Sequence, residues 1–157
     1  MHDSVDPAHT LVGDTMTNDM LLLRLLAWRA QTGELRIRTI LQSSMHTKLR
    51  MLLLVQKKEY SELEAHIHGL AAAKGIMLEE KDPLVQYLSS KLLMLRISLS
   101  KSNSPVAAYM IRSCTQGMID AQTVLNRCPP GTNPLYCIAQ RLLDCEKDCI
   151  YKLRIYL

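Results

Sequence analysis

The sequence predicts an all-α fold, a four-helix bundle with a long helical crossover between the second and third bundle helices. Three observations predict it. The second half of the chain repeats the first, because residues 113–125 align with residues 29–41 at an offset of 113 − 29 = 84. Long segments place apolar residues every three or four positions, which is the spacing of one helix face. No Val-, Ile- and Thr-rich segment alternates apolar with polar residues as a strand would.

The first bundle helix is expected at about residues 18–43. Residues 1–16 keep no sustained period and contain Pro7, so we expect a flexible N-terminal tail before a bundle that spans residues 17–157. Asn18 can cap the helix. Its predicted buried face is Leu22, Leu26, Ala30, Gly33, Ile37 and Ile40.

The second bundle helix is expected at about residues 46–74, with Gly75 as a favourable C-terminal cap. Its predicted buried face is Leu52, Val55, Glu59, Glu62, Leu63, His66, Leu70 and Ala73. A further helix is expected at about residues 83–101, because Pro83 suits the first turn of a helix that Asp82 can cap. This helix lies in the connection to the third bundle helix, so we expect it to be the crossover.

The third and fourth bundle helices are expected at about residues 105–127 and 133–156, on either side of a Cys128-Pro-Pro-Gly131 turn. The predicted buried faces are Val106, Met110, Cys114, Gly117, Ala121 and Val124 on the third helix, and Leu135, Ile138, Leu142, Cys145, Glu146, Cys149, Leu153 and Tyr156 on the fourth. The connection before the third helix can span a helix of about 25 residues, or about 38 Å at 1.5 Å per residue. Two tight hairpins joined in this way give a four-helix bundle with one crossover.

Composition and charge narrow the class of protein. The chain has 157 residues, 48% hydrophobic and 4% aromatic with no Phe, which fits one helical domain with a core of Leu and Met. Its 19 basic and 15 acidic residues are interspersed, so we expect a mixed-charge surface and no nucleic-acid partner. The apolar run at residues 21–27 is short and contains Arg24, so we expect no membrane span. No signal-peptide pattern is visible at the start, and the expected location is the cytoplasm.

The five cysteines are not expected to form a disulfide framework, because their number is odd and no secretion signal accompanies them. Cys145 and Cys149 lie four residues apart, on one face of the fourth helix. Buried free thiols behave as small apolar residues, so core packing explains both. The alternative is a soft-metal site completed by His66 from across the core.

Gly33 and Gly117 occupy matching positions in the repeat, and each lies in the middle of a predicted helix on its apolar face. A glycine there costs about 1 kcal/mol relative to alanine, so a compensating reason is expected. Close approach of two helix backbones is the simplest reason. Binding of a ligand beside the glycines is the alternative.

Glu62 and Glu146 also match across the repeat, and both fall on predicted buried faces (146 − 62 = 84). Two buried carboxylates are costly unless they are paired, protonated or bound to a cation. A metal ion in the bundle core would remove that cost. In the other interpretation, both carboxylates lie at the edge of the face and reach solvent.

The ligands of a two-metal bundle test the metal hypothesis. Such a site takes one Glu from each of two helices and Glu-x-x-His from each of the other two. Ala65 follows Glu62 by three residues, Cys149 follows Glu146 by three, and neither is His. His66 shares a face with Glu62, and the incomplete set of candidate ligands is Glu62, His66 and Glu146. Glu59 is a further candidate. Glu34 and Asp120, on the other two helices, do not match across the repeat. We therefore expect no bound cofactor and no catalytic residue.

Three motifs carry a resemblance to a known family: Ala30-Gln-Thr-Gly33, Ser104-Pro-Val-Ala-Ala-Tyr-Met-Ile-Arg-Ser-Cys-Thr-Gln-Gly117 and Arg141-Leu-Leu-Asp-Cys-Glu146. Over about residues 18–157 the chain resembles the ferritin-like superfamily, and more narrowly small bacterial ferritin-like proteins of uncharacterised function. The resemblance implies a crossover between the second and third helices and a twofold relation between the hairpins. Metal-active members oxidise iron or activate oxygen at a two-metal centre. This chain keeps Glu62 and Glu146 where such ligands would come from, and lacks both histidines.

The expected function is that of a non-enzymatic, cytoplasmic helical bundle that acts through protein–protein contact or self-association. An exposed apolar patch on the 84–101 segment would support this hypothesis; it would be formed by Leu92, Met94 and Leu95. The alternative is a metal-binding or redox protein with a degenerate ferritin-like site. A third hypothesis is a small-molecule carrier with a gap beside Gly33 and Gly117.

Overall fold

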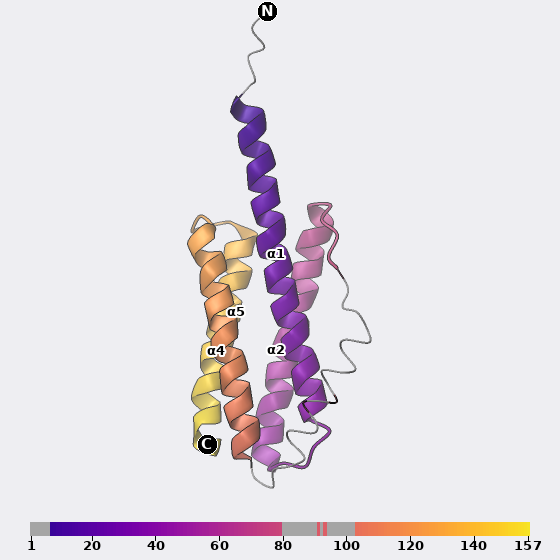
Figure 1. Cartoon of the computed structure of the whole chain (residues 1–157), viewed down its shortest axis with the longest axis vertical. Helices are drawn as coiled ribbons and strands as arrows, with labels where there is room; N and C mark the ends of the chain where they lie inside the picture. The colour runs from indigo at the N-terminus through magenta and orange to yellow at the C-terminus, as the bar shows by residue number, and fades with distance from the viewer. Residues whose placement is uncertain (1–6, 80–90, 92, 94–102) are drawn as a thin grey trace, which may run out of the picture.

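The computed structural model describes residues 7–79, 91, 93 and 103–157, with side chains from residue 18 onward. Besides the helical residues 91 and 93, this part of the chain forms four α-helices and one short 3₁₀ helix, and it contains no strand. The helices are α1 (Pro7–Ile40), α2 (Thr47–Ala73), α4 (Ser104–Arg127) and α5 (Pro134–Leu153), and the 3₁₀ helix η1 (Arg154–Tyr156) follows α5 directly. Figure 1 shows them side by side with nearly parallel axes. The predicted all-α four-helix bundle is confirmed.

The helix directions follow from contacts at the two ends of the bundle. At one end the backbone N–H of His46, just before α2, donates to the side-chain oxygen of Asn103, just before α4 (3.2 Å). At the other end Lys74, just after α2, pairs with Asp19 of α1 (3.2 Å). Helices α2 and α4 therefore run in the same direction, and α1 and α5 run opposite to both (Figure 1). Each helix packs against two antiparallel neighbours: α1 and α5 each contact both α2 and α4.

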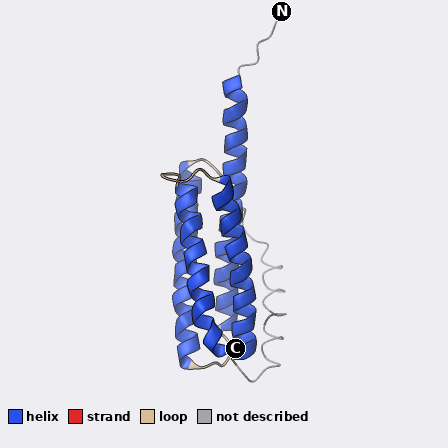
Figure 2. Ribbon diagram, turned by 90° about the vertical axis from the view of Figure 1, so that its left-hand side faces the viewer, coloured by secondary structure: helices blue, strands red, loops and turns tan. Residues whose placement is uncertain are grey.

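Helix α1 begins at Pro7, eleven residues before the expected start at residue 18 (18 − 7 = 11). Proline fits the first turn of a helix, where no backbone N–H is required, and so it starts α1 instead of interrupting it. Residues 7–16, expected as part of the tail, are thus helical, and residues 1–6 lie outside the described part. The first turns of α1 extend beyond the ends of the other helices (Figures 1 and 2).

The α1–α2 hairpin turns tightly because Arg50 binds the carbonyl oxygens at the end of α1. Its guanidinium donates to the backbone oxygens of Leu41 and Ser43, each at 2.9 Å. Helix α1 ends at Ile40, close to the expected residue 43. At the other end of α2, Gly75 has the positive φ of +66° that was expected of a C-terminal cap.

The second hairpin has similarly clear ends. Pro105 lies in the first turn of α4, and Pro134 lies in the first turn of α5. The Asn133 side chain caps α5 by accepting a hydrogen bond from the backbone N–H of Leu135 (3.0 Å). The predicted helices 105–127 and 133–156 are therefore close to the observed α4 and α5 with η1. The predicted crossover helix at 83–101 lies outside the described residues except for residues 91 and 93, which are helical.

The core is built from apolar side chains of all four helices, and leucine is the most frequent residue in it. The largest fully buried side chains include Leu23, Leu26, Ile37, Leu49, Leu53, Leu63, Ile67, Met110, Leu135 and Leu142. Burying one such side chain stabilises the fold by about 1.5–3 kcal/mol. The predicted faces of α1 and α4 are buried in full. On α5 the predicted face is buried or half-buried throughout.

The predicted buried face of α2 is wrong. The observed face is Leu49, Leu53, Gln56, Tyr60, Leu63, Ile67 and Ala71, and only Leu63 belongs to both sets. Val55, His66 and Ala73 are instead exposed, and Glu62 is half-buried. Residues 51–55 are all apolar, so the start of the helix is compatible with more than one stripe. Both stripes also contain polar side chains, Gln56 and Tyr60 on the observed face and Glu59, Glu62 and His66 on the predicted one, so polarity does not separate them.

Candidate functional site

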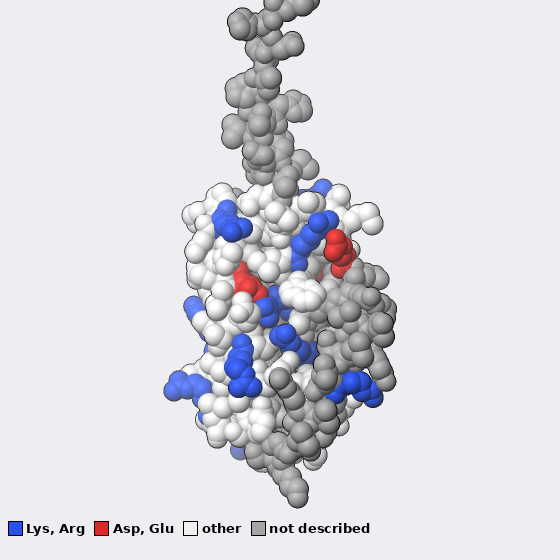
Figure 3. Space-filling model, in the orientation of Figure 1, with Lys and Arg blue, Asp and Glu red and all other residues white. Residues whose placement is uncertain are grey.

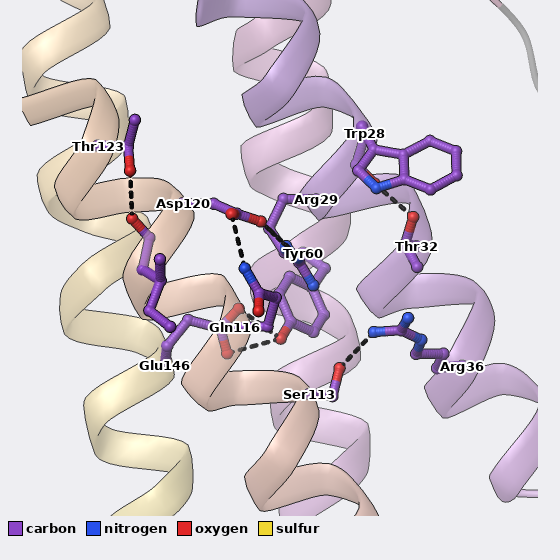
Figure 4. A network of polar contacts seen from close by, with 11 residues as sticks. Trp28, Arg29, Thr32, Arg36, Tyr60, Ser113, Gln116, Asp120, Thr123 and Glu146 are labelled. Atoms are coloured by element: carbon purple, nitrogen blue, oxygen red, sulfur yellow. Dashed lines mark hydrogen bonds and ion pairs between the residues drawn. The ribbon is translucent and has the colours of Figure 1, made fainter. Parts of the chain in front are cut away.

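The centre of the bundle holds a buried tyrosine–carboxylate pair. The Tyr60 hydroxyl lies 2.9 and 2.8 Å from the two carboxyl oxygens of Glu146. Tyr60 is 1% exposed and Glu146 is 0% exposed. Tyr60 comes from α2 and Glu146 from α5, so this contact joins the two hairpins across the core (Figure 4).

Two glycines provide the space for this pair. A Cβ atom on Gly33 would lie 2.6 Å from the Tyr60 ring, and a Cβ atom on Gly117 would lie 2.7 Å from the Glu146 carboxyl carbon. Both distances are too short for a real contact, so a larger residue at either site would displace the pair. Two helix backbones were expected to approach each other closely at these glycines. Instead, a side chain of one helix packs against the backbone of the next at each glycine. The volume beside the glycines that a small ligand would need is filled by Tyr60 and Glu146.

The repeat takes a different form here from the one expected. Tyr60 packs on Gly33 as Glu146 packs on Gly117, which relates Tyr60 to Glu146 at an offset of 146 − 60 = 86. The glycines themselves are 117 − 33 = 84 residues apart. The residue of α2 in the place of Glu146 is therefore Tyr60. Glu62, two residues further along, projects away from the core.

Burial controls the protonation of this centre. Loss of solvent raises the pKa of Glu146 to about 7, although hydrogen bonds with Cys114 and Tyr60 and the charges of Arg29 and Arg36 act in the opposite direction. Burial, followed by the charge of Glu146, also raises the pKa of the Tyr60 phenol well above its usual value. The phenol therefore keeps its proton and donates to the carboxyl group.

Thiols complete the surroundings of the carboxyl group. Cys114 and Cys149 are fully buried, and a hydrogen bond with Cys149 together with burial raises the pKa of the Cys114 thiol. Cys145 accepts a hydrogen bond from the Gln56 side-chain amide (3.1 Å), and burial raises its pKa to about 12. Protonated, buried thiols of this kind pack as small side chains.

A second polar layer joins α1 to α4 beside the Tyr60–Glu146 pair. The Arg29 guanidinium forms an ion pair with Asp120, with Nε at 2.8 Å from the carboxylate. The Gln116 amide donates to the other oxygen of the same carboxylate (3.1 Å). Arg36 donates to the Ser113 hydroxyl (2.6 Å). Figure 4 shows these contacts around the pair, and Figure 3 shows more basic than acidic side chains on the face formed by α1 and α4.

The predicted candidate ligands are divided between two places. Glu146 is in the core, whereas Glu62 and His66 lie at the surface beside Arg141. The Arg141 guanidinium contacts Glu62 at 2.6 Å and the His66 ring at 3.2 Å. It also contacts Glu59 at 3.1 Å. The interpretation in which both carboxylates face the core fails for Glu62, and the interpretation in which both reach solvent fails for Glu146. The placement of His66 across the core from Cys145 is wrong, because α2 is rotated relative to the predicted face.

The other carboxylates of the expected metal level are also paired with protein cations. Asp120 binds Arg29, and Glu34 binds Arg38 at 2.8 Å and Lys57 at 3.3 Å. Guanidinium and ammonium groups thus neutralise these carboxylates. Within the described residues, no group of three or more His, Cys, Asp or Glu side chains is arranged to hold a metal ion.

A groove on the outside of the bundle runs between α2 and α5. Its volume is about 840 Å³, and adjacent hollows extend it toward η1. We call this feature the outer groove; its lining includes Met51, Leu52, Val55, Tyr136, Tyr151 and Ile155. Glu59, Arg141, Asp144 and Lys152 provide charge along it. The sequence contained a signal for this groove, since Val55 and Leu52 are large apolar residues on the α2 stripe that was mistaken for the core.

Comparison with known proteins does not assign this chain to a family: no family model, curated protein or solved structure matches it. None of the helices in the described ranges is long and apolar enough to cross a lipid bilayer. The functional interpretation therefore rests on the two features above, the buried Tyr60–Glu146 pair and the outer groove.

Proposed function

We propose that this protein is a non-enzymatic helical bundle that acts through protein–protein contact, and that the contact is self-association through the outer groove. The observation that carries the proposal is a set of large apolar side chains exposed along one groove. Val55 is 58% exposed, Tyr151 is 71% exposed and Ile155 is 81% exposed. Contiguous exposed apolar surface marks interaction sites on soluble proteins.

The core supports a structural rather than a chemical role for the buried polar groups. Tyr60 and Glu146 satisfy each other and lie buried against Gly33 and Gly117. A substrate could reach the carboxyl group only if the bundle opened. A satisfied buried polar pair fixes how two hairpins fit together, and we assign that role to it.

We also propose that the fold is ferritin-like, with the crossover between α2 and α4, and that the protein is cytoplasmic. The helix directions support the crossover, because Lys74 at the end of α2 pairs with Asp19, whereas Asn103 before α4 bonds to His46 at the opposite end of the bundle. A chain that joins those two points has to travel the length of the bundle. The apolar patch expected on residues 84–101 lies outside the described residues, so it does not enter this proposal.

Sedimentation velocity over a wide range of protein concentrations tests self-association. We expect the wild-type protein to form a dimer or larger oligomer, and Val55→Glu to shift it toward monomer. Ile119→Glu is the matched control, because Ile119 is 54% exposed on α4, away from the groove. A wild-type protein that stays monomeric at the highest concentrations would contradict the proposal.

The alternative, a metal-binding or redox protein with a degenerate ferritin-like site, would need ligands that the chain now uses for other contacts. Glu59, Glu62 and His66 surround Arg141, and Glu146 binds Tyr60. Elemental analysis of protein purified without a polyhistidine tag separates the two proposals. Stoichiometric iron, manganese or zinc that is lost in Glu62→Ala would favour the alternative.

A further inference from the structure

The outer groove extends along most of α5. Tyr136 and Gln140 line its beginning, Val55 and Asp148 lie in its middle, and Ile155 and Tyr156 line its far end. Such an elongated surface suits a partner that is itself elongated, such as another pair of helices. A small globular ligand would fill only part of it.

The size of this face matches a weak to moderate protein interface. The 20 residues of α5 rise about 30 Å, and two packed helices are roughly 20 Å wide. The face therefore measures roughly 600 Å² on each copy, or about 1,200 Å² for a symmetric pair, which is the lower end of the range for specific interfaces.

Charge along α5 makes this surface complementary to itself. Asp144 lies in the half nearer Tyr136, Asp148 lies near the middle, and Lys152 and Arg154 lie in the half nearer Ile155. Two copies of α5 placed antiparallel bring the acidic half of each next to the basic half of the other. A parallel arrangement would place like charges together, and opposite charges across an interface are what fix its register.

The remaining charges of the groove are already neutralised within one copy. Arg141 is held by Glu59 and Glu62. Asp148 pairs with Lys152 at 2.6 Å, one helical turn away, and because both side chains are more than half exposed, Lys152 can also reach a carboxylate of a second molecule. Asp144 accepts a hydrogen bond from the Gln140 amide (3.0 Å) and projects into solvent, where it is available to a cation from another molecule.

We infer that a second copy of this chain packs antiparallel on the outer groove, about a twofold axis near Val55 and Asp148, so that Asp144 of each copy lies opposite Lys152 of the other. The two residues are each four positions from Asp148, so a twofold axis at that level exchanges them. Val55 lies beside Asp148 in the groove and meets its own copy at the axis. The antiparallel geometry rests on the proposed function, self-association, and specifies its partner and orientation.

Charge reversal at these two positions tests the geometry. In Asp144→Lys both ends of the symmetric contact become positive, and in Lys152→Asp both become negative. Each variant alone should dissociate roughly tenfold more readily than wild type, because two weak attractions become two repulsions. An equimolar mixture of the two variants should form a one-to-one heterodimer, because every contact between unlike variants joins opposite charges. Lys147→Glu is the control, since Lys147 is exposed on α5 but does not line the groove.

Sedimentation velocity with one variant carrying an absorbing label measures this mixing. Heterodimer formation in the mixture but not in either variant alone supports the antiparallel pair. Wild type could self-associate while each variant alone associates as strongly as wild type and the mixture forms no preferred heterodimer. In that case the antiparallel geometry is wrong and the proposed self-association stands. If wild type is monomeric at all concentrations, both are wrong. High salt should weaken the preference for the heterodimer, because exposed ion pairs are screened.

Discussion

Tyr60 and Glu146 come from different hairpins, 86 residues apart, and meet at the centre of the bundle (146 − 60 = 86). The phenol donates to a carboxyl group that no solvent reaches, and each of the two side chains lies against a glycine of the neighbouring helix. In a metal-containing bundle, buried carboxylates are compensated by a cation. In this chain a phenol, a thiol and two more distant arginines compensate a single carboxyl group.

Removing the phenol should destabilise the fold. Tyr60→Phe keeps the ring that packs on Gly33 but deletes the hydroxyl that donates to Glu146. A buried acceptor left without its donor costs about 1–3 kcal/mol, so the free energy of unfolding should fall by that amount. Urea denaturation followed by circular dichroism measures it. Tyr151→Phe is the matched control, because that ring is 71% exposed and should leave stability unchanged. Equal effects of the two substitutions would contradict the assigned role of the Tyr60 hydroxyl.

The raised pKa of Glu146 predicts a specific dependence of stability on pH. The carboxyl group releases its proton near pH 4.5 in the unfolded chain and near pH 7 in the folded protein. Between these values the folded state binds more protons than the unfolded state. The contribution of Glu146 to the free energy of unfolding therefore decreases as the pH rises, and it is constant above about pH 7. The full difference corresponds to about 3 kcal/mol as an order of magnitude.

The variant Glu146→Gln isolates this contribution, because its amide oxygen can still accept from Tyr60 but does not titrate. Other carboxylates change stability in the same range, so the informative quantity is wild type minus Glu146→Gln at each pH. We expect the free energy of unfolding of wild type minus that of Glu146→Gln to decrease between pH 5 and pH 7. Urea denaturation at each pH measures it. Glu62→Gln is the control, since hydrogen bonding with Arg141 lowers the pKa of that half-buried surface carboxylate. A wild-type minus Glu146→Gln difference that does not vary with pH would show that Glu146 is ionised throughout.

How far sequence predicted this fold depends on how clearly each helix is amphipathic. All six residues predicted for the buried face of α4 are buried, because its apolar residues form one stripe bounded by Arg112, Gln116 and Asp120. Helix α2 begins with five consecutive apolar residues at 51–55, and the stripe of Leu52 and Val55 is as regular as that of Leu49 and Leu53. Sequence periodicity alone does not distinguish the two.

The buried pair was only half predicted for a related reason. Glu146 lies on an α5 stripe that is otherwise apolar, which placed it on the predicted buried face but left open whether the carboxyl group reaches solvent. Tyr60 is inward because its hydroxyl has a partner on α5, and that partner is far away in sequence. A polar side chain is stable in the core only when another residue forms a hydrogen bond with it. The rotation of α2 that buries Tyr60 therefore depends on its long-range contact with Glu146.

Arg141 should matter mainly at low salt. It joins Glu59 and Glu62 of α2 to α5 at the edge of the outer groove, in a position open to solvent. Arg141→Gln should leave those two carboxylates to repel each other and lower the unfolding temperature slightly in dilute buffer. The difference should largely disappear in 1 M salt, where exposed charges are screened over about 3 Å. Thermal denaturation of both proteins at the two salt concentrations measures it, and an equally large difference in 1 M salt would point to packing of the side chain.

The two buried glycines make the sharpest prediction, because they should reverse the usual effect of a helical Gly→Ala substitution. In a helix interior alanine is more stable than glycine by about 1 kcal/mol. Gly69→Ala should show that gain, since nothing lies within 4 Å of a Cβ atom there. Gly33→Ala and Gly117→Ala should instead destabilise the fold by about 1–3 kcal/mol, because the new methyl group overlaps the Tyr60 ring or the Glu146 carboxyl group.

Urea denaturation of the three glycine variants measures these differences under one set of conditions. The comparison is direct because all three glycines lie within long α-helices and differ mainly in what the added methyl group meets. Combining Gly117→Ala with Glu146→Ala should recover part of the loss attributable to Gly117→Ala alone, since the shortened side chain no longer overlaps the methyl group. A stabilising effect of Gly33→Ala or Gly117→Ala would mean that the hairpins do not approach as closely as the Tyr60–Glu146 contact requires.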